Sequence, residues 1–152
     1  MTVAAAPRRT IFYPRLMPQT PPASSANVSA RMSRARNTDT GAELALRSAL
    51  HRKGLRFRVH RRIDGIPRIR PDIVFVSARL AGFVDGCFWH RCPDHQTFPK
   101  ANAAWWQAKL DRNVERDRLT DAALGAAGWG VLRVWEHEDV EGAARRVEGA
   151  LG

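Results

Sequence analysis

Residues 84–95 concentrate metal-binding, acid–base and aromatic side chains in one short run, which reads Val84-Asp85-Gly86-Cys87-Phe88-Trp89-His90-Arg91-Cys92-Pro93-Asp94-His95. The run holds both cysteines of the chain and two of its five histidines. The spacing of Cys87, Cys92 and His95 lets one tight loop turn three ligands inward. Thiolate and imidazole suit tetrahedral zinc, so the run predicts a zinc site whose fourth ligand comes from elsewhere in the chain.

Two other interpretations of the same run stay open at this point. Asp85 and His90 follow an apolar segment that resembles a strand, and a carboxylate and an imidazole placed there are candidates for metal binding and proton transfer. Alternatively, Cys87 and Cys92 are buried thiols beside a structural histidine, because free cysteine is often simply buried.

Composition and charge indicate the class of partner. The chain has 152 residues, enough for one domain, and 25 lysines and arginines against 15 acids give a formal charge of +10. Most of the excess is arginine, whose planar fork pairs with phosphate, so nucleic acid is the expected partner. The alternative explanation of the positive charge is that the protein comes from an arginine-rich proteome.

No apolar run reaches the roughly 18 residues of a membrane span, and no secretory signal is evident, so we expect a cytoplasmic protein with reduced cysteines.

The first residues differ in composition from the rest. Residues 1–30 contain five prolines with alanine and serine runs, which predicts a flexible arm that carries Arg8, Arg9 and Arg15. We expect residues 31–152 to form the folded domain.

Periodicity predicts the regular elements of that domain. A helix over residues 40–53 has Glu43 in its first turn, where the glutamate either stabilises the helix start or takes a catalytic role. The further elements are strands over 55–60, 71–76 and 79–84, a long helix over 103–127, a strand over 129–135 and a helix over 139–150. The short gap between the second and third strands predicts a hairpin. Strands interleaved with helices predict a mixed α/β domain with a central sheet flanked by helices.

The hairpin gives the acidic residues a chemical purpose. Asp72 at the entry of one strand and Asp85 at the end of the next bring two carboxylates to one edge of the sheet. Magnesium prefers such hard oxygen ligands, and cleavage of a phosphodiester needs charge neutralisation and an activated water. His90 has an unperturbed pKa of about 6.5, which suits it to accept a proton near neutrality.

Several separate patches of the sequence resemble one family. They are Met32-Ser33-Arg34, Asp39-Thr40, Glu43, Arg70-Pro71-Asp72, the run from Phe83 to Trp89, Asn113-Val114-Glu115-Arg116-Asp117, Gly128-Trp129 and Val134-Trp135-Glu136. Together they resemble the very short patch repair (Vsr) DNA mismatch endonucleases, over about Met32 to His137. The most specific motifs are Gly-Cys-Phe-Trp-His and the Trp-Glu pair before the last expected ligand.

The resemblance implies a restriction-endonuclease-like fold with a structural zinc site. It also implies a magnesium-dependent nick on the 5′ side of the thymine in a T·G mismatch. By the same resemblance, Asp72 and the backbone carbonyl of Val84 match the magnesium ligands. Glu43 matches the glutamate of the first helix, His90 the imidazole general base, and Asp117 an acid of the long helix.

The sequence departs from the familiar pattern of the family in three places. Asp85 stands where that pattern has histidine, so it either binds the metal directly or orients a metal-bound water. The loop lacks the histidine that usually precedes its second cysteine. The final zinc ligand, usually a cysteine, is His137 here, and His51 and His60 are the alternatives. Two sulfurs and two nitrogens still complete a zinc tetrahedron.

The resemblance also implies how DNA is recognised. Phe88, Trp89 and Trp106 would enter the base stack beside the mismatch while Met32 probes from the opposite groove, although these rings could instead roof the core. The remaining predicted DNA contacts are Arg34, which we expect to bind phosphate, and Asn113.

The expected partner is duplex DNA with a T·G mismatch, bound by a monomer, with other mismatch-repair proteins as candidate partners. Two further hypotheses are a zinc-stapled DNA-binding module without catalysis and a related nuclease that acts on another DNA lesion.

Overall fold

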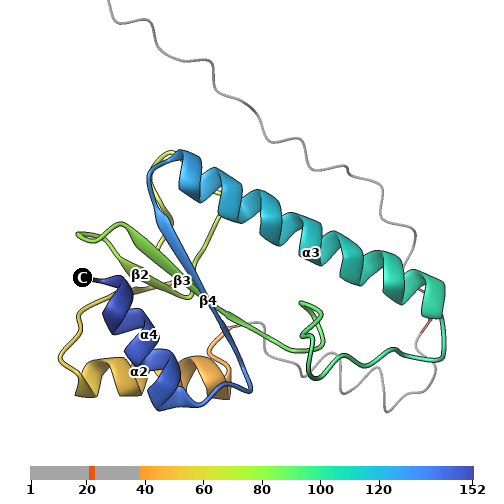
Figure 1. Cartoon of the computed structure of the whole chain (residues 1–152). Coiled ribbons are helices and arrows are strands. Elements are labelled where there is room, and N and C mark those ends of the chain that lie inside the picture. Colours follow the sequence, from red (N-terminus) through yellow and green to blue (C-terminus); the bar gives the residue numbers. More distant parts are fainter. Residues whose placement is uncertain (1–20, 23–37) are drawn as a thin grey trace, which may run out of the picture.

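The computed structural model of the chain describes residues 21–22 and 38–152. Met32, Arg34 and nearly all of the predicted N-terminal arm therefore lie outside the described residues. In the described part, a four-stranded mixed sheet lies between helices on its two faces (Figure 1). The elements in chain order are α2 (Gly41–Arg52), β1 (Arg58–Val59), β2 (Ile73–Phe75), β3 (Leu80–Asp85), α3 (Ala103–Ala126), β4 (Gly130–Trp135) and α4 (Val140–Ala150). Each predicted helix and strand is present, with β1 and β2 shorter than predicted.

Helix α2 begins where the sequence predicts it. Thr40 is the N-cap residue, and its hydroxyl oxygen accepts a hydrogen bond from the Glu43 backbone N at 3.3 Å. Glu43 Oε2 in turn accepts a hydrogen bond from the Asp39 backbone N at 3.0 Å. The Thr40 contact satisfies a backbone donor that the first turn of a helix leaves without an intrahelical partner, and the Glu43 contact ties the residue before the N-cap to the same turn. After the helix, Gly54 adopts a φ of 75°, the left-handed conformation that commonly follows a helix end.

The first strand is shorter than its pattern predicts. A strand is expected over residues 55–60, but only Arg58 and Val59 pair with β2. β1 is an edge strand in which Val59 is 42% exposed, and His60, at a φ of 48°, turns the chain away from the sheet. Phe57 still packs against the core, so the apolar positions of the pattern serve packing more than strand pairing.

The second and third strands form the predicted hairpin. Ile73 lies opposite Gly82 and Phe75 opposite Leu80 in an antiparallel ladder. Glycine at position 82 allows the Ile73 side chain to cross over it, because a Cβ there would lie 2.5 Å from Ile73 Cγ1. The hairpin therefore fixes the distance between the first residue of β2 and the last residue of β3.

Strand β4 pairs in parallel with β3, and α3 makes the connection between them. The register ends with Asp85 beside Trp135, so the two strands finish at the same edge of the sheet. Side chains alternate along a strand, which puts Phe83 and Asp85 of β3 on one face together with Arg133 of β4. Phe83 and Leu124 of α3 belong to one hydrophobic cluster, so this face lies under α3.

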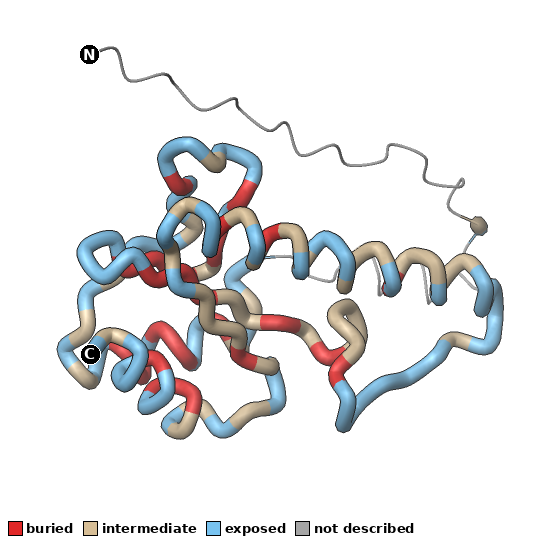
Figure 2. Tube along the Cα trace, turned by 45° about the horizontal axis from the view of Figure 1, so that its top comes forward, coloured by how far each residue is buried: buried red, intermediate tan, exposed pale blue. Residues whose placement is uncertain are grey.

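Two cores form, one on each face of the sheet, and Figure 2 shows their buried residues. Helices α2 and α4 cover one face. Helix α3 covers the other only in part, since Leu110, Thr120 and Leu124 are its buried residues. The N-terminal half of α3 runs beyond the sheet above the loop of residues 86–100 (Figure 1). None of the described helices has the length and apolar content needed to cross a membrane.

Candidate active site and metal centre

Asp72 and Asp85 lie at the edge of the sheet where β2 begins and β3 ends. Asp72 Oδ2 accepts a hydrogen bond from the Val84 backbone N at 2.7 Å, which ties the two strands together at this edge. Burial raises the pKa of Asp72 to about 6; the hydrogen bond from Val84 opposes the rise, and the negative charge of Glu43 adds to it. A cation bound beside this carboxyl group would stabilise its charged form and lower its pKa.

Glu43 both caps α2 and lies near Asp72. Its side chain is 4% exposed, and Oε2 accepts a hydrogen bond from Arg47 Nη2 at 2.8 Å. His60 stands between the two acids, with Nε2 3.9 Å from Glu43 Oε2 and Nδ1 3.9 Å from Asp72 Oδ1. Asp39, Glu43 and His60 hold ligand atoms within 4.8 Å of one another, but Arg47 donates to both carboxylates and offsets part of their negative charge. The structure therefore shows the capping contact and also brings Glu43 to the site.

His90 is paired with the acid of the long helix. Its Nδ1 lies 2.5 Å from Asp117 Oδ2 and 3.7 Å from Asp85 Oδ1. The carboxylate of Asp117 assigns the proton to Nδ1, so Nε2 keeps a lone pair that can accept a proton. The side chain is 20% exposed and borders a hollow between the loop and α3, so water reaches it. The predicted base and its helical acid are thus brought together.

Arg133 is a site residue that the sequence pattern alone did not indicate. Its Nη1 donates hydrogen bonds to both carboxylate oxygens of Asp85, at 2.8 and 3.0 Å. Its Nε and Nη2 donate to Asp121 on α3, and Nη2 lies 3.8 Å from Asp117. Burial raises the pKa of Asp85, while His90 and Arg133 oppose the rise. The feature of the sequence that could have indicated Arg133 is its place in an apolar strand, at an alternating position that faces inward.

The four predicted zinc ligands meet in one cluster. The ligand atoms of Cys87, Cys92, His95 and His137 all lie within 4.8 Å of one another. Cys87 Sγ is 3.0 Å from His137 Nδ1, and Cys92 Sγ is 3.6 Å from His137 Nδ1 and 3.7 Å from His95 Nδ1. Two ligands of one zinc, at bond lengths of about 2.0–2.3 Å, lie about 3.5 Å apart, so the spacing and the donor set fit the ion. Burial raises the pKa of the Cys87 thiol, an effect that a bound dication reverses.

The alternative fourth ligands lie elsewhere. His51 stacks on Phe57 with ring centroids 4.6 Å apart, and His60 belongs to the group around Glu43. Next to the cluster, Glu136 Oε1 accepts a hydrogen bond from the Cys87 backbone N at 2.7 Å. The end of β4 therefore fixes the start of the loop through a backbone contact as well as through His137.

The predicted DNA-binding aromatic residues also form one cluster. Ring centroids are 5.0 Å apart for Phe88 and Trp89, 5.4 Å for Phe88 and Trp106, and 6.1 Å for Trp89 and Trp106. All three rings are half-buried, and Lys109 Nζ lies 5.4 Å from the centroids of both tryptophans. Asn113 Nδ2 donates a hydrogen bond to the Trp89 carbonyl at 3.1 Å, so this predicted DNA contact also holds the loop.

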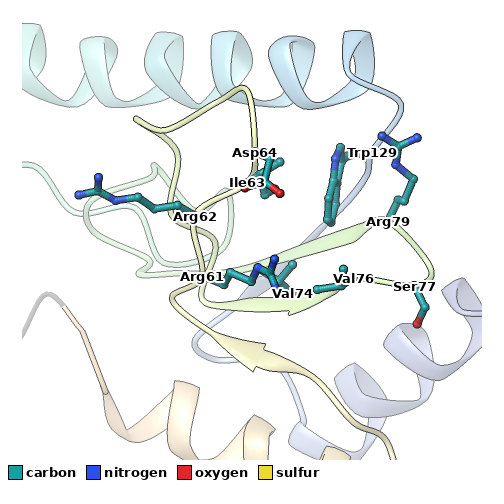
Figure 3. Close-up of a pocket in the computed structure, with 9 residues that line it drawn as sticks. All are labelled: Arg61, Arg62, Ile63, Asp64, Val74, Val76, Ser77, Arg79 and Trp129. Atoms are coloured by element: carbon teal, nitrogen blue, oxygen red, sulfur yellow. The ribbon is translucent and has the colours of Figure 1, made fainter.

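A separate pocket opens at the opposite end of β3, near the turn of the hairpin (Figure 3). Arg61, Arg62, Arg79 and Trp129 line it together with the apolar side chain of Val74. It contains none of the predicted site residues. The groups capable of hydrolysis are therefore gathered at the other edge, where β3 and β4 end.

A sheet edge that carries the half-buried Asp72, the buried Asp85 and a histidine–aspartate pair, in a chain with a charge of +10, is the arrangement expected of a nuclease. Comparisons with known proteins give the particular family. A model described as "DNA mismatch endonuclease Vsr" matches residues 23–96. The chain belongs to this Vsr family, and the helix-flanked mixed sheet agrees with the restriction-endonuclease-like fold that the family implies.

Individual relatives support this assignment. The chain is 48% identical over 130 residues to the type II nicking enzyme V.NaeI of Lentzea aerocolonigenes, covering 84% of this chain and 78% of that protein. It is 46% identical over 110 residues to the type II nicking enzyme V.XorIIP of Xanthomonas oryzae pv. oryzae, covering 70% and 77%. It is 40% identical over 102 residues to the DNA mismatch endonuclease Vsr of Escherichia coli, covering 64% and 62%.

The raised pKa of Asp72 predicts a pH-dependent stability effect. Because the folded pKa of about 6 exceeds the ordinary value of 3.8, the native state holds the proton more tightly, and stability falls as pH rises through that window. Asp72→Asn removes this loss while its amide oxygen can still accept from Val84. We expect the metal-free variant to be more stable than the parent near pH 7, by at most about 3 kcal/mol, and equal to it near pH 4. Urea unfolding at both pH values measures this; equal effects at the two would contradict it.

Proposed function

We propose that the protein nicks one strand of duplex DNA on the 5′ side of the thymine in a T·G mismatch and so initiates very short patch repair. The observation that carries this proposal is the convergence of Asp72, Asp85 and the His90–Asp117 pair at one sheet edge, directly beside the aromatic cluster. The similarity to nicking enzymes and to a mismatch endonuclease supports it.

Magnesium is the cation that we assign to the edge of the sheet. Asp72 and the carbonyl of Val84 would hold it, and Asp85 would either bind it directly or orient a water on it. Carboxylate and carbonyl oxygens are the hard ligands that magnesium prefers, and the half-buried Asp72 carboxyl has a raised pKa that a cation would lower. When bound, magnesium supplies positive charge that stabilises the charge developing on the phosphoryl oxygens.

The side chains around the edge perform the proton transfers. His90 Nε2 accepts a proton from the attacking water, because Nδ1 is held by Asp117 in the tautomer that leaves Nε2 free. Asp117 then stabilises the imidazolium that forms. Glu43, held by Arg47, keeps negative charge beside Asp72 and so favours the cation there.

Recognition of the mismatch is assigned to the aromatic cluster. Phe88, Trp89 and Trp106 enter the base stack, with Met32 on the opposite groove, at an unstacking cost of a few kcal/mol that is lower where the bases are already poorly paired. Stacking on the rings returns about 1–3 kcal/mol per base. Asn113 holds the Trp89 carbonyl, which sets the loop in place for this contact.

The structural ion is assigned as zinc. It would join Cys87, Cys92 and His95 of the loop to His137 after β4 and so hold His90, which lies within that loop, against α3. We place the protein in the cytoplasm, acting on nucleoid DNA as a monomer, with other mismatch-repair proteins as candidate partners.

Two other functions are less well supported. A zinc-stapled DNA-binding module without catalysis would leave Asp72 and the His90–Asp117 pair without a purpose, since carboxylates repel phosphate unless a cation intervenes. A nuclease of the same fold that acts on another DNA lesion would use the same residues for cleavage. It differs only in what the aromatic cluster recognises.

The zinc assignment predicts the metal content and a loss of stability. Purified protein should contain about one zinc per chain. Cys92→Ala should lose the ion and melt at a much lower temperature, because a structural zinc contributes folding free energy. His51→Ala, which removes a histidine outside the cluster, should keep the ion. A metal-free parent protein that melts at the same temperature as the purified form would contradict the assignment.

Cleavage is tested with labelled T·G and T·A duplexes incubated with the protein and magnesium, followed by mapping of any nick. We expect a nick 5′ of the mismatched thymine only. Asp72→Asn should abolish nicking and retain DNA binding, and His90→Ala should slow nicking by roughly 10²–10⁴, the usual contribution of a general base. Asp64→Asn, a carboxylate change at the distant pocket, should nick at the parent rate. Binding without cleavage by the parent protein would favour the DNA-binding module.

The aromatic wedge predicts a selective loss of affinity. Trp89→Ala should weaken binding to the T·G duplex more than to the T·A duplex at one salt concentration, because unstacking costs less free energy at the poorly paired mismatch. Arg34→Ala should weaken both alike and reduce the salt slope by about 1, as expected for a phosphate contact. Phe98→Ala, an exposed ring at 54% exposure outside the cluster, is the matched control. Equal losses on both duplexes for a folded Trp89→Ala protein would mean that the rings serve packing.

A further inference from the structure

Arg133 links the two parts of the site that the chain supplies from different elements. It lies on β4 between Asp85 of β3 and Asp121 of α3, and its side chain is 22% exposed. Nη1 contacts both oxygens of Asp85, while Nε and Nη2 contact Asp121. One side chain therefore spans the gap between the sheet and the helix at the level of the site.

The fold determines this position. Strand alternation puts Arg133 on the face under α3, where it lies beside Phe83 in the parallel register and its guanidinium is 4.6 Å from the ring centroid. Asp117 and Asp121 are four residues apart on α3, so they share one face of the helix. That face meets the guanidinium, with Asp121 in hydrogen-bonded contact and Asp117 3.8 Å from Nη2.

Three consequences follow for the residues around His90. Asp85 has both oxygens engaged by Arg133, with Oδ1 3.7 Å from His90 Nδ1, so its position is set by the arginine. Asp117 shares its environment with the same guanidinium while it accepts from His90. The positive charge also offsets carboxylates that would otherwise repel a phosphate at this edge.

We propose that Arg133 is a positioning residue for nicking: it fixes Asp85 and the α3 carboxylates so that His90 keeps the orientation in which Nε2 faces the attacking water. The proposal rests on the proposed function and extends it. Asp85 then serves as the counter-ion of Arg133 beside the metal, which favours orientation of a water over direct ligation. Lysine cannot replace Arg133, because one ammonium lacks the planar set of donors needed to bridge two carboxylates.

The test is a double-mutant cycle of Arg133→Met and Asp85→Asn, with kcat and KM measured on the T·G duplex. Arg133→Met should lower kcat about 10²-fold, as expected for misplacement of a catalytic group, with a smaller change in KM. In the Asp85→Asn background the same change should lower kcat by less than about tenfold, because the carboxylate to be positioned is absent. Arg145→Met, an exposed arginine on α4, controls for the change of charge and should leave kcat unchanged.

A second measurement does not depend on turnover. In the metal-free protein at one pH, the proton between His90 Nδ1 and Asp117 should give a downfield NMR signal that is absent in His90→Ala. Arg133→Lys, which keeps the charge and is the variant to use if Arg133→Met does not fold, should shift or broaden this signal and lower kcat. Arg145→Met should leave the signal as it is in the parent protein.

The outcomes separate the two proposals. If the parent protein nicks no duplex, the proposed function fails, and the NMR signal alone decides the role of Arg133. An unchanged signal and an unchanged kcat in folded Arg133→Lys overturn the positioning role. Equal losses of kcat from Arg133→Met in both Asp85 backgrounds also overturn it, because they would mean that the arginine only ties β4 to α3 through Asp121.

Discussion

The parallel pairing of β3 with β4 joins two segments that lie about a third of the chain apart, and the remainder of the site is built on this contact. The register runs from Leu80 beside Gly130 to Asp85 beside Trp135, so the residues that follow each strand leave the sheet together. Cys87 and His137 are 50 positions apart in sequence and 3.0 Å apart at their ligand atoms for this reason. A parallel pair needs a long connection, and α3 is that connection, which is why the same helix can supply an acid to the site.

Charge pairing sorts the carboxylates of the site into two kinds. Arg47 holds Asp39 and Glu43, and Arg133 holds Asp85 and Asp121, so these acids are already paired with a guanidinium. Among the described residues, the titratable groups that act on the Asp72 carboxyl are His60, whose Nδ1 lies 3.9 Å from Asp72 Oδ1, and other acids. In the part of the chain that the structure describes, Asp72 is thus a half-buried carboxyl for which no ion pair with an arginine is found. A divalent cation would neutralise this carboxylate, in agreement with the magnesium site that we propose.

Local rules predicted the parts of the structure that depend on local physics. The cap at Thr40 placed the start of α2, and the ligand spacing from Cys87 to His95 indicated a cluster that His137 completes in the structure. Arg133 was not predicted, because alternation assigns a side chain to a face of the sheet but does not say which helix covers that face or which acids it carries. The same limit applies to β1, where Val59 follows the strand pattern but lies at an exposed edge.

The loop and α3 hold together the residues that we propose for mismatch recognition and for proton transfer. Trp89 and His90 are consecutive residues, and α3 holds both, through Asn113 at the Trp89 carbonyl and Asp117 at His90 Nδ1. Asn113 and Asp117 are four residues apart, so they grip the loop from adjacent turns of the same helix face. If a base step displaces Trp89 as proposed, the backbone that it moves is the one that carries His90. Insertion of Trp89 into the DNA and the orientation of the His90 imidazole would then be coupled through a single peptide unit, without any change elsewhere in the fold.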